Sequence, residues 1–205
     1  LEDDPKPCVL INTFDDLEIE SIKAIENIEV ISVGPLIPSA FADGIDPSDK
    51  SFGCDLFEAK NRGIDYLQWL DSKPARSVIY VSFGSLAVVK KEQKVEILGS
   101  LLESGKPFLW IIRGGKDSDD EDEAVKAAIE EGAIGEGIIM PWCSQIEVLS
   151  HQSIGCFISH CGWNSTLESL VAGVPILGCP RFSDQMTNAK MVEEVWGIGV
   201  RASRS

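Results

Sequence analysis

Residues 160–165 read H-C-G-W-N-S and carry side chains suited to holding an anion. They follow an apolar run and precede a helical one, so a strand is expected to turn into a helix here. Gly162 allows a close backbone approach, and Asn164 or Ser165 can cap the helix. His160 adds a side-chain donor, and the helix start adds N–H groups and the positive end of its dipole. The segment therefore predicts a diphosphate site.

Glu168 lies four residues beyond Asn164, one turn along the same face of the predicted helix. A carboxylate there can accept hydrogen bonds from the two vicinal hydroxyls of a ribose. The alternative is that Glu168 only complements the positive end of the helix. We predict a ribose contact.

Trp142 follows Pro141 at the end of a predicted strand, where an indole can offer a flat face to a base. We predict that it stacks on uracil; a buried core tryptophan is the alternative. Cys143 offers backbone N–H and C=O groups beside that ring. Gln145 lies within one turn's reach of a ribose hydroxyl.

Two more loops contribute polar groups. Asp184 and Gln185 place a carboxylate and an amide side by side at another helix start, where Asp184 as a simple N-cap is the alternative. Ser85 ends the turn S-F-G-S that closes the first strand of the predicted sheet. We expect Ser85 to make a further phosphate contact.

A parallel sheet is needed to bring these loops together. From Ser77 onward, near-continuous apolar strands alternate with helices, which is typical of a doubly wound, Rossmann-like α/β domain. Ligands bind such a domain where the strands' C-terminal ends meet helix N-termini. Strands are predicted at 78–83, 108–112, 137–140, 156–159, 175–178 and 198–201. Helices are predicted at 91–104, 123–131, 145–149, 165–172 and 185–196.

The earlier part of the chain has a different texture. A strand, a helix at 17–25 and a second strand near 30–33 precede a stretch rich in Pro, Gly, Ser and Asp. We predict that residues 1–36 end one domain, that 37–75 form a linker with a short helix, and that 76–205 form the next domain, incomplete at its C-terminus. Because the chain starts at Leu1 rather than Met, and its first element is a strand at 8–14 with no fold ahead of it, we expect the chain to be truncated.

Composition restricts the possible partners. The chain has 205 residues, 44% of them hydrophobic, and a net charge of −15, which gives no general attraction for nucleic acid or an anionic membrane. No apolar run is long enough to span a bilayer and no signal peptide is visible, so a cytoplasmic protein is expected. The six cysteines lack a C-x-x-C pair, so we expect them to be reduced.

Metal sites are the weaker interpretation. The run D-S-D-D-E-D-E at 117–123 contains D-x-D twice, but it is most economically a solvated loop. A zinc site would have to use adjacent His160 and Cys161, which cannot easily face one ion. His151 follows a predicted helix end, and we expect it to make a structural hydrogen bond.

The stretch from Trp142 to Gln185 resembles the signature box of plant family-one UDP-glycosyltransferases. That box runs W-x-x-Q-x-x-V-L-x-H, then H-C-G-W-N-S-x-x-E, then G-V-P and a closing D-Q, and every one of these letters is present. Four further segments look like the middle of a chain of the same family. They are L-I-N-T-F-D-D-L-E, V-G-P-L, W-L-D-S-K-P-A-R-S-V-I-Y-V-S-F-G-S and F-L-W-I-I-R.

This resemblance implies a GT-B fold of two facing Rossmann-like domains, of which residues 76–205 would bind the UDP-sugar. It implies an inverting transfer without metal or cofactor, whose base is a histidine in a part of the protein absent here. His151 and His160 fall at other motif positions. Asp184 and Gln185 would hold the transferred sugar, together with Trp163, and a final Gln accompanies glucose more often than galactose.

The resemblance implies a glucosyltransferase that moves glucose from UDP-glucose to a hydroxyl or carboxyl of a small plant metabolite. A flavonoid or anthocyanin, an auxin-type acid and crocetin are the expected kinds of acceptor. We expect a monomer whose partners are the donor and the acceptor, with no nucleic acid and no membrane span. The rival is a non-catalytic, truncated product that binds UDP-sugar without turnover, since no base is available.

Overall fold

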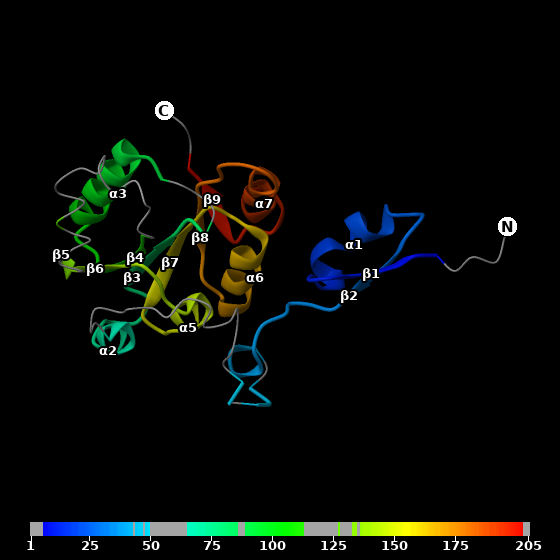
Figure 1. Cartoon of the computed structure of the whole chain (residues 1–205), viewed down its shortest axis with the longest axis horizontal. Helices are drawn as coiled ribbons and strands as arrows, with labels where there is room; N and C mark the ends of the chain where they lie inside the picture. The colour runs from blue at the N-terminus through cyan, green and yellow to red at the C-terminus, as the bar shows by residue number, and fades with distance from the viewer. Residues whose placement is uncertain are drawn as a thin grey trace. The chain divides into compact units, whose positions relative to one another are not determined.

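The computed structural model describes residues 6–42, 44–46, 48–49, 65–85, 89–112, 127, 133–134 and 136–202. The chain divides into two compact units, Leu1–Ser51 and Phe52–Ser205, each taken by itself below (Figure 1). The acidic run at 117–123 lies outside the described residues. So does the helix predicted at 123–131, apart from residue 127.

The first unit is a parallel strand pair with a crossover helix. Strand β1 (Cys8–Ile11) pairs with β2 (Glu29–Ser32), and α1 (Asp15–Lys23) supplies the connection that parallel strands require. The helix begins two residues earlier than predicted, with Asp15 and Asp16 in its first turn, where carboxylates complement the dipole. A short 3₁₀ turn follows, η1 (Ser39–Phe41).

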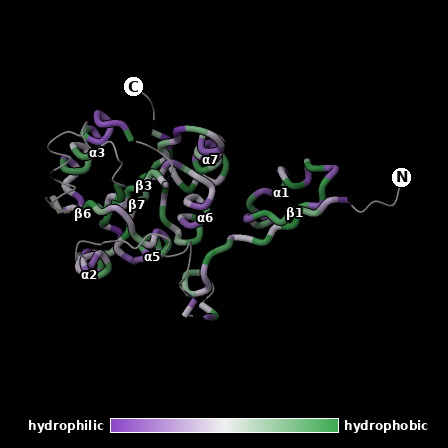
Figure 2. Tube along the Cα trace, in the orientation of Figure 1, coloured by the Kyte–Doolittle hydropathy of each residue, from purple (hydrophilic) through white to green (hydrophobic). Residues whose placement is uncertain are grey.

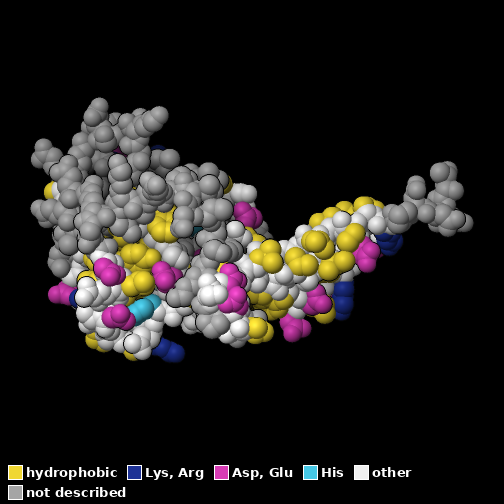
Figure 3. All heavy atoms as spheres, turned by 60° about the horizontal axis from the view of Figure 1, so that its bottom comes forward, with side chains coloured by type: hydrophobic (Ala, Val, Ile, Leu, Met, Phe, Trp, Pro, Cys, Tyr) yellow, Lys and Arg dark blue, Asp and Glu magenta, His cyan; other side chains and the backbone are white. Residues whose placement is uncertain are grey.

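Large apolar side chains stand on the surface of this unit. A space-filling view shows them gathered over much of its visible face (Figure 3). Two strands and one helix cannot enclose such residues on both sides of the pair. Among the described residues, the exposed ones are Val9, Leu10, Ile19, Ile25, Ile28, Ile31, Val33, Leu36 and Ile45.

The second unit is built on a seven-stranded sheet. Its strands are β3 (Val78–Ser82), β4 (Phe108–Ile111), β5 (Ala133–Ile134), β6 (Gly137–Met140), β7 (Ile154–Ser159), β8 (Ile176–Gly178) and β9 (Gly199–Arg201). Six are parallel, which confirms the predicted sheet. The two-residue β5, antiparallel to β6, was not predicted.

The strand order is β5-β6-β4-β3-β7-β8-β9. Along the six parallel strands this is the 3-2-1-4-5-6 order of the Rossmann fold. The strand order reverses between β3 and β7, so the connections that leave these two strands run to opposite faces of the sheet. Ligands bind at that reversal point, outside the carboxyl ends of the strands.

Helices cover both faces of the sheet. In Figure 1, α3 (Lys91–Glu103) lies above it, and α2 (Tyr66–Asp71) and α5 (Gln145–Leu149) lie below it. Helix α7 (Gln185–Lys190) packs on Ile176, which pairs with Phe157 and shares its face, so α7 covers the same face as α2 and α5. Tyr80 and Phe157 pack on the α2 and α5 side, whereas Val81 packs on the α3 side. The strands therefore carry apolar residues on both faces. In Figure 2, β3 and β7 are accordingly coloured largely as hydrophobic.

The helix predicted at 185–196 is not continuous. It is α-helical to Lys190 and then widens into a π-helical turn, η3 (Met191–Val195). The N–H of Trp196 bonds to the carbonyl of Met191 at 2.8 Å, one residue further back than in an α-helix.

We expect Phe157→Ala to destabilise the second unit by about 3–5 kcal/mol, the usual cost of emptying a buried aromatic site. Phe157 is fully buried, and its ring stacks on that of Tyr80 with centroids 4.9 Å apart. Urea unfolding measures the loss. Val200→Ala on β9, at a position 56% exposed, is the control and should change stability by less than about 0.5 kcal/mol. Similar losses for the two variants would contradict this core assignment.

Candidate functional site

His160 sits in a slot between two glycines at the reversal point of the sheet. It follows β7, whose last residue Ser159 pairs with Ser82 of β3. A Cβ built on Gly84, just after β3, would lie 2.6 Å from His160 Nε2, and one on Gly162 would lie 2.5 Å from it. Both glycines are therefore needed for the imidazole to occupy this place. Gly84 also has a φ of +75°, which favours glycine.

The His160 side chain is half-buried, and burial lowers its pKa. The Ser82 backbone and the charge of Asp184 oppose that shift in pKa, and Arg181 adds to it. The imidazole is thus neutral at pH 7 and donates from one nitrogen. Among the described residues, its buried Nδ1 has no hydrogen-bond partner of good geometry.

Helix α6 (Trp163–Ala172) starts directly after this slot, at Gly162. The prediction that Asn164 or Ser165 caps it is wrong, because the extended backbone of Gly162 (φ −63°, ψ 148°) already forms the N-cap. Its carbonyl accepts the N–H of Thr166 at 3.0 Å, the first bond of the helix. Asn164 and Ser165 therefore belong to the first turn, at the positive end of the dipole.

A buried polar network links α5, α6 and β3. Gln145 Nε2 donates to Glu168 Oε2 at 2.9 Å and to Ser165 Oγ at 2.8 Å. Gln145 Oε1 accepts from the hydroxyl of Tyr80 at 3.3 Å. The structure thus joins Gln145 and Glu168, both predicted as ribose contacts, and orients the carboxylate. Tyr80 was missed because its place in an apolar strand indicates only a core residue.

Glu168 is 5% exposed, and burial raises the pKa of its carboxyl from 4.5 to about 7, opposed only in part by the Gln145 hydrogen bond. A carboxylate that merely complements the helix dipole would face water. Glu168 instead carries a desolvation cost that accepting two ribose hydroxyls would offset.

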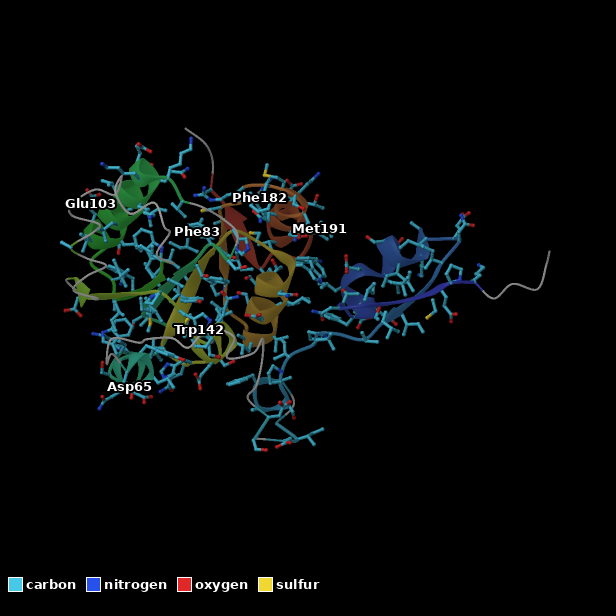
Figure 4. All side chains as sticks on the ribbon, viewed as in Figure 1. Asp65, Phe83, Glu103, Trp142, Phe182 and Met191 are labelled. Carbon is cyan, nitrogen blue, oxygen red and sulfur yellow. The ribbon has the colours of Figure 1, made fainter. Side chains whose placement is uncertain are left out.

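Trp142 is half-buried after β6, so the alternative of a buried core tryptophan is wrong. In the view of Figure 4 it lies toward α5. The Cys143 thiol is buried 3.4 Å from the Tyr80 hydroxyl, and burial raises the pKa of the thiol to about 12. It therefore stays protonated, which leaves the backbone of Cys143 as its means of meeting a ligand.

The loop after β8 arranges Asp184 and Gln185 differently from a simple cap. Asp184 occupies the N-cap position of α7, but its side chain makes no capping bond; its Oδ2 instead accepts from Asn188 Nδ2 at 2.7 Å. Gln185 is buried, and its Oε1 accepts the N–H groups of Arg181 at 3.0 Å and Phe182 at 3.3 Å. Asp184 is exposed beside this anchored amide.

Trp163 and Ser85 complete the predicted set. Trp163 is half-buried, and its ring lies 6.3 Å from that of Trp196 at a tilt of 56°. Ser85 is exposed next to Gly84, at the edge of the His160 slot. Sequence reasoning missed Arg181, because its only signal was a cationic residue just before the predicted sugar contacts.

His151 makes the structural hydrogen bonds predicted for it. Its Nδ1 accepts the N–H of Ser153 at 3.2 Å, and its Nε2 lies 3.1 Å from Asp71 Oδ1. It precedes β7 and so lies at the amino edge of the sheet, away from the carboxyl-edge residues. Among the described residues, no three His, Cys, Asp or Glu side chains form a metal-binding group, and the five described cysteines are free.

We expect Gly84→Ala to displace the His160 ring and weaken UDP binding by on the order of tenfold, as loss of a hydrogen bond would. Gly173→Ala is the matched control, because Gly173 also has a positive φ (+66°) but nothing lies within 4 Å of its added Cβ. Both variants should lose about 1–2 kcal/mol of stability from backbone strain. Urea unfolding and calorimetric titration with UDP measure the two effects. Equal UDP affinity in both variants would show that the slot is dispensable.

Glu168 should make stability fall as pH rises. Because its folded pKa (about 7) exceeds the ordinary 4.5, the folded state binds the extra proton, and unfolding becomes easier as pH rises through this window. The loss is on the order of 3 kcal/mol. Glu168→Gln should remove that part of the pH dependence, whereas Glu96→Gln on exposed α3 should leave it. Urea unfolding between pH 4.5 and 7.5 tests this, and parallel curves for the chain and Glu168→Gln would contradict it.

Comparison with known proteins points to one family. Residues 39–204 match the family "UDP-glucoronosyl and UDP-glucosyl transferase". Phloretin 4'-O-glucosyltransferase of Malus domestica is 55% identical over 99% of this chain and 43% of its own length. Crocetin glucosyltransferase, chloroplastic, of Gardenia jasminoides is 54% identical over 98% of this chain and 42% of its own length.

A solved structure supports the same family. Os79 from O. sativa in complex with UDP superposes with a TM-score of 0.82 at 40% identity, covering 96% of this chain and 42% of that one. The chain thus spans about two fifths of the length of the relatives it matches. With its Rossmann-like sheet and complete signature box, the chain belongs to the GT-B family of UDP-glucuronosyl and UDP-glucosyl transferases.

Proposed function

We propose that this chain binds the nucleotide-sugar donor of a plant UDP-glucose-dependent glucosyltransferase. The observation that carries the proposal is the cluster at the reversal point between β3 and β7. There, a neutral histidine precedes the N-terminus of α6, and the second turn of this helix carries the buried carboxylate of Glu168. These three groups match the phosphates and the ribose of a nucleotide.

The donor would extend across this edge of the sheet in four steps. Uracil stacks on Trp142 and meets the backbone of Cys143, and the ribose hydroxyls bond to Gln145 and Glu168. The proposed diphosphate contacts are Ser85, His160, Gly162, Asn164 and Ser165. The proposed sugar contacts are Trp163, Asp184 and Gln185.

The chain's part in catalysis would be to stabilise the leaving group. An acceptor oxygen attacks the anomeric carbon as its bond to the diphosphate oxygen breaks, so negative charge grows on UDP. His160 and the start of α6 are placed to donate to that charge. Because the imidazole is neutral, it contributes a hydrogen bond and not a charge.

The proton of the acceptor would go to a base outside this chain. Of the two histidines in the sequence, His151 is bonded to Ser153 and faces Asp71 at the opposite edge of the sheet. His160 is enclosed between two glycines. This arrangement favours a second candidate function for the chain by itself: binding of UDP-sugar without turnover.

The names of the relatives support a small-molecule acceptor. They name crocetin, phloretin and an anthocyanidin 3-O-glucoside. We propose an acceptor of this kind, a flavonoid-like or acidic plant metabolite. In the part of the chain that the structure describes, no helix is long and apolar enough to cross a membrane. A cytoplasmic monomer remains our prediction, and one relative is named chloroplastic.

The domain limits are also a proposal. The exposed apolar residues of the first unit are what one strand pair of a larger sheet would show. We propose that residues 1–36 of this unit belong to the acceptor domain, with residues 37–75 as linker and 76–205 as donor domain.

Calorimetric titration of the chain with UDP-glucose, UDP-galactose and UDP tests donor binding. Trp142→Ala should weaken all three by about 1–3 kcal/mol, the usual contribution of one base stacked on an aromatic ring, and Trp142→Phe should retain most of the affinity. Glu168→Gln should weaken them as well. Glu147→Gln should not, since Glu147 bonds to Tyr66 on α2.

Thermal unfolding of the same samples establishes that they are folded. A folded chain that shows no saturable heat with any of the three nucleotides would refute donor binding. Turnover by the isolated chain with a phenolic acceptor would refute the assignment of the base to another part of the protein.

A further inference from the structure

Arg181 joins three parts of the second unit that are far apart in sequence. It lies in the loop between β8 and α7, just before the proposed sugar contacts. Its Nη1 and Nη2 both donate to Gln93 Oε1 at 3.1 Å, in the first turn of α3. Its guanidinium carbon lies 5.3 Å from the centre of the Phe83 ring. Phe83 is 5% exposed and directly precedes Gly84, so the arginine rests on a fixed support beside the His160 slot.

The acceptor atom of this contact is shared with the start of α3. Gln93 Oε1 also accepts the N–H of Lys90 at 3.4 Å. The oxygen that accepts from Arg181 is therefore also bonded to the backbone at the start of α3. A planar guanidinium can place two N–H donors on one oxygen while its face lies on an aromatic ring, which a lysine cannot do.

The backbone of the same loop fixes Gln185. The N–H groups of Arg181 and Phe182 both donate to Gln185 Oε1. Because these donors require an oxygen, they settle the orientation of the amide and direct its NH₂ group away from the loop backbone. That NH₂ is the group of Gln185 able to donate to a sugar hydroxyl. Contacts that fix the loop before α7 therefore also fix the amide of Gln185.

On the basis of the proposed function, we propose that Arg181 is a positioning residue for the transferred sugar. It clamps the loop before α7 onto the ends of β3 and α3, and so fixes Gln185 in the orientation that a hexose hydroxyl requires. Arg181 need not touch the sugar. The base, ribose and diphosphate contacts lie on other loops, so the clamp should act on the hexose and leave the rest of the nucleotide bound.

The first experiment compares UDP-glucose with UDP in calorimetric titrations. In Arg181→Gln and in Gln93→Ala, UDP-glucose affinity should fall about five- to tenfold, as expected for loss of one anchored contact, while UDP affinity changes less than about twofold. Gln93→Glu keeps the hydrogen-bond acceptor and should bind UDP-glucose like the unchanged chain. Arg181→Lys should retain only part of the affinity for UDP-glucose. The double variant should lose no more than either single one.

Arg76→Gln is the control, because it removes the same charge from an exposed arginine at the amino end of β3. Equal losses for UDP and UDP-glucose in Arg181→Gln, or no loss for either, would overturn the positioning role.

The second experiment needs no ligand. Hydrogen exchange of the Phe182 amide should be about tenfold faster in Arg181→Gln and Gln93→Ala than in the unchanged chain and Arg76→Gln, because freeing the loop exposes its bond to Gln185. Unchanged exchange would refute the clamp. Failure of the unchanged chain to bind UDP-glucose would instead refute the proposed function, so the two failures are distinguishable. Faster exchange with unaltered preference between UDP-glucose and UDP would show that the clamp has no part in sugar binding.

Discussion

The parallel pairing of β3 with β7 is the constraint on which the rest of the second unit depends. These strands come from distant parts of the chain, and their register brings Ser82 opposite Ser159. Gly84 and His160 follow those two residues, so the register alone sets the glycine against the imidazole. A slip of one residue would turn every side chain of the strand to the other face and remove the slot. The buried packing of Tyr80 and Phe157 below the sheet fixes the register against such a slip.

The same packing makes a costly polar group possible. Glu168 is buried and accepts a hydrogen bond from Gln145. The amide oxygen of Gln145 in turn accepts one from the Tyr80 hydroxyl. A buried carboxylate destabilises the fold when ionised, so the chain holds it there against its own stability. Such a conflict between folding and local chemistry is characteristic of binding sites, where a ligand supplies the missing partners.

Sequence patterns predicted the sheet because its strands are apolar on both faces, as Phe108–Ile111 and Gly137–Met140 show. They missed β5, since two edge residues carry no periodicity. They placed the start of α6 two residues late, because a glycine N-cap has no side chain to mark it. Long-range polar contacts were also out of reach. The bonds from Gln145 to Glu168 and from Arg181 to Gln93 join residues 23 and 88 positions apart, and no local pattern specifies such partners. The candidate residues were therefore predicted one by one, whereas their network was not.

A chain with a net charge of −15 must bind a diphosphate against its own long-range field. The described groups at the site do little to reverse that sign, since Asp184 is exposed nearby and His160 is neutral. Two features can still favour the anion. The dipole end of α6 and the hydrogen-bond donors around it act within a few ångströms, where they outweigh charges that salt screens over about 8–10 Å. Binding of this kind depends on directed donors more than on opposite charge, so geometry controls it. A site that recognises the anion by geometry needs loops in fixed positions. This requirement explains why glycines, a buried network and an arginine clamp surround one small edge of the sheet.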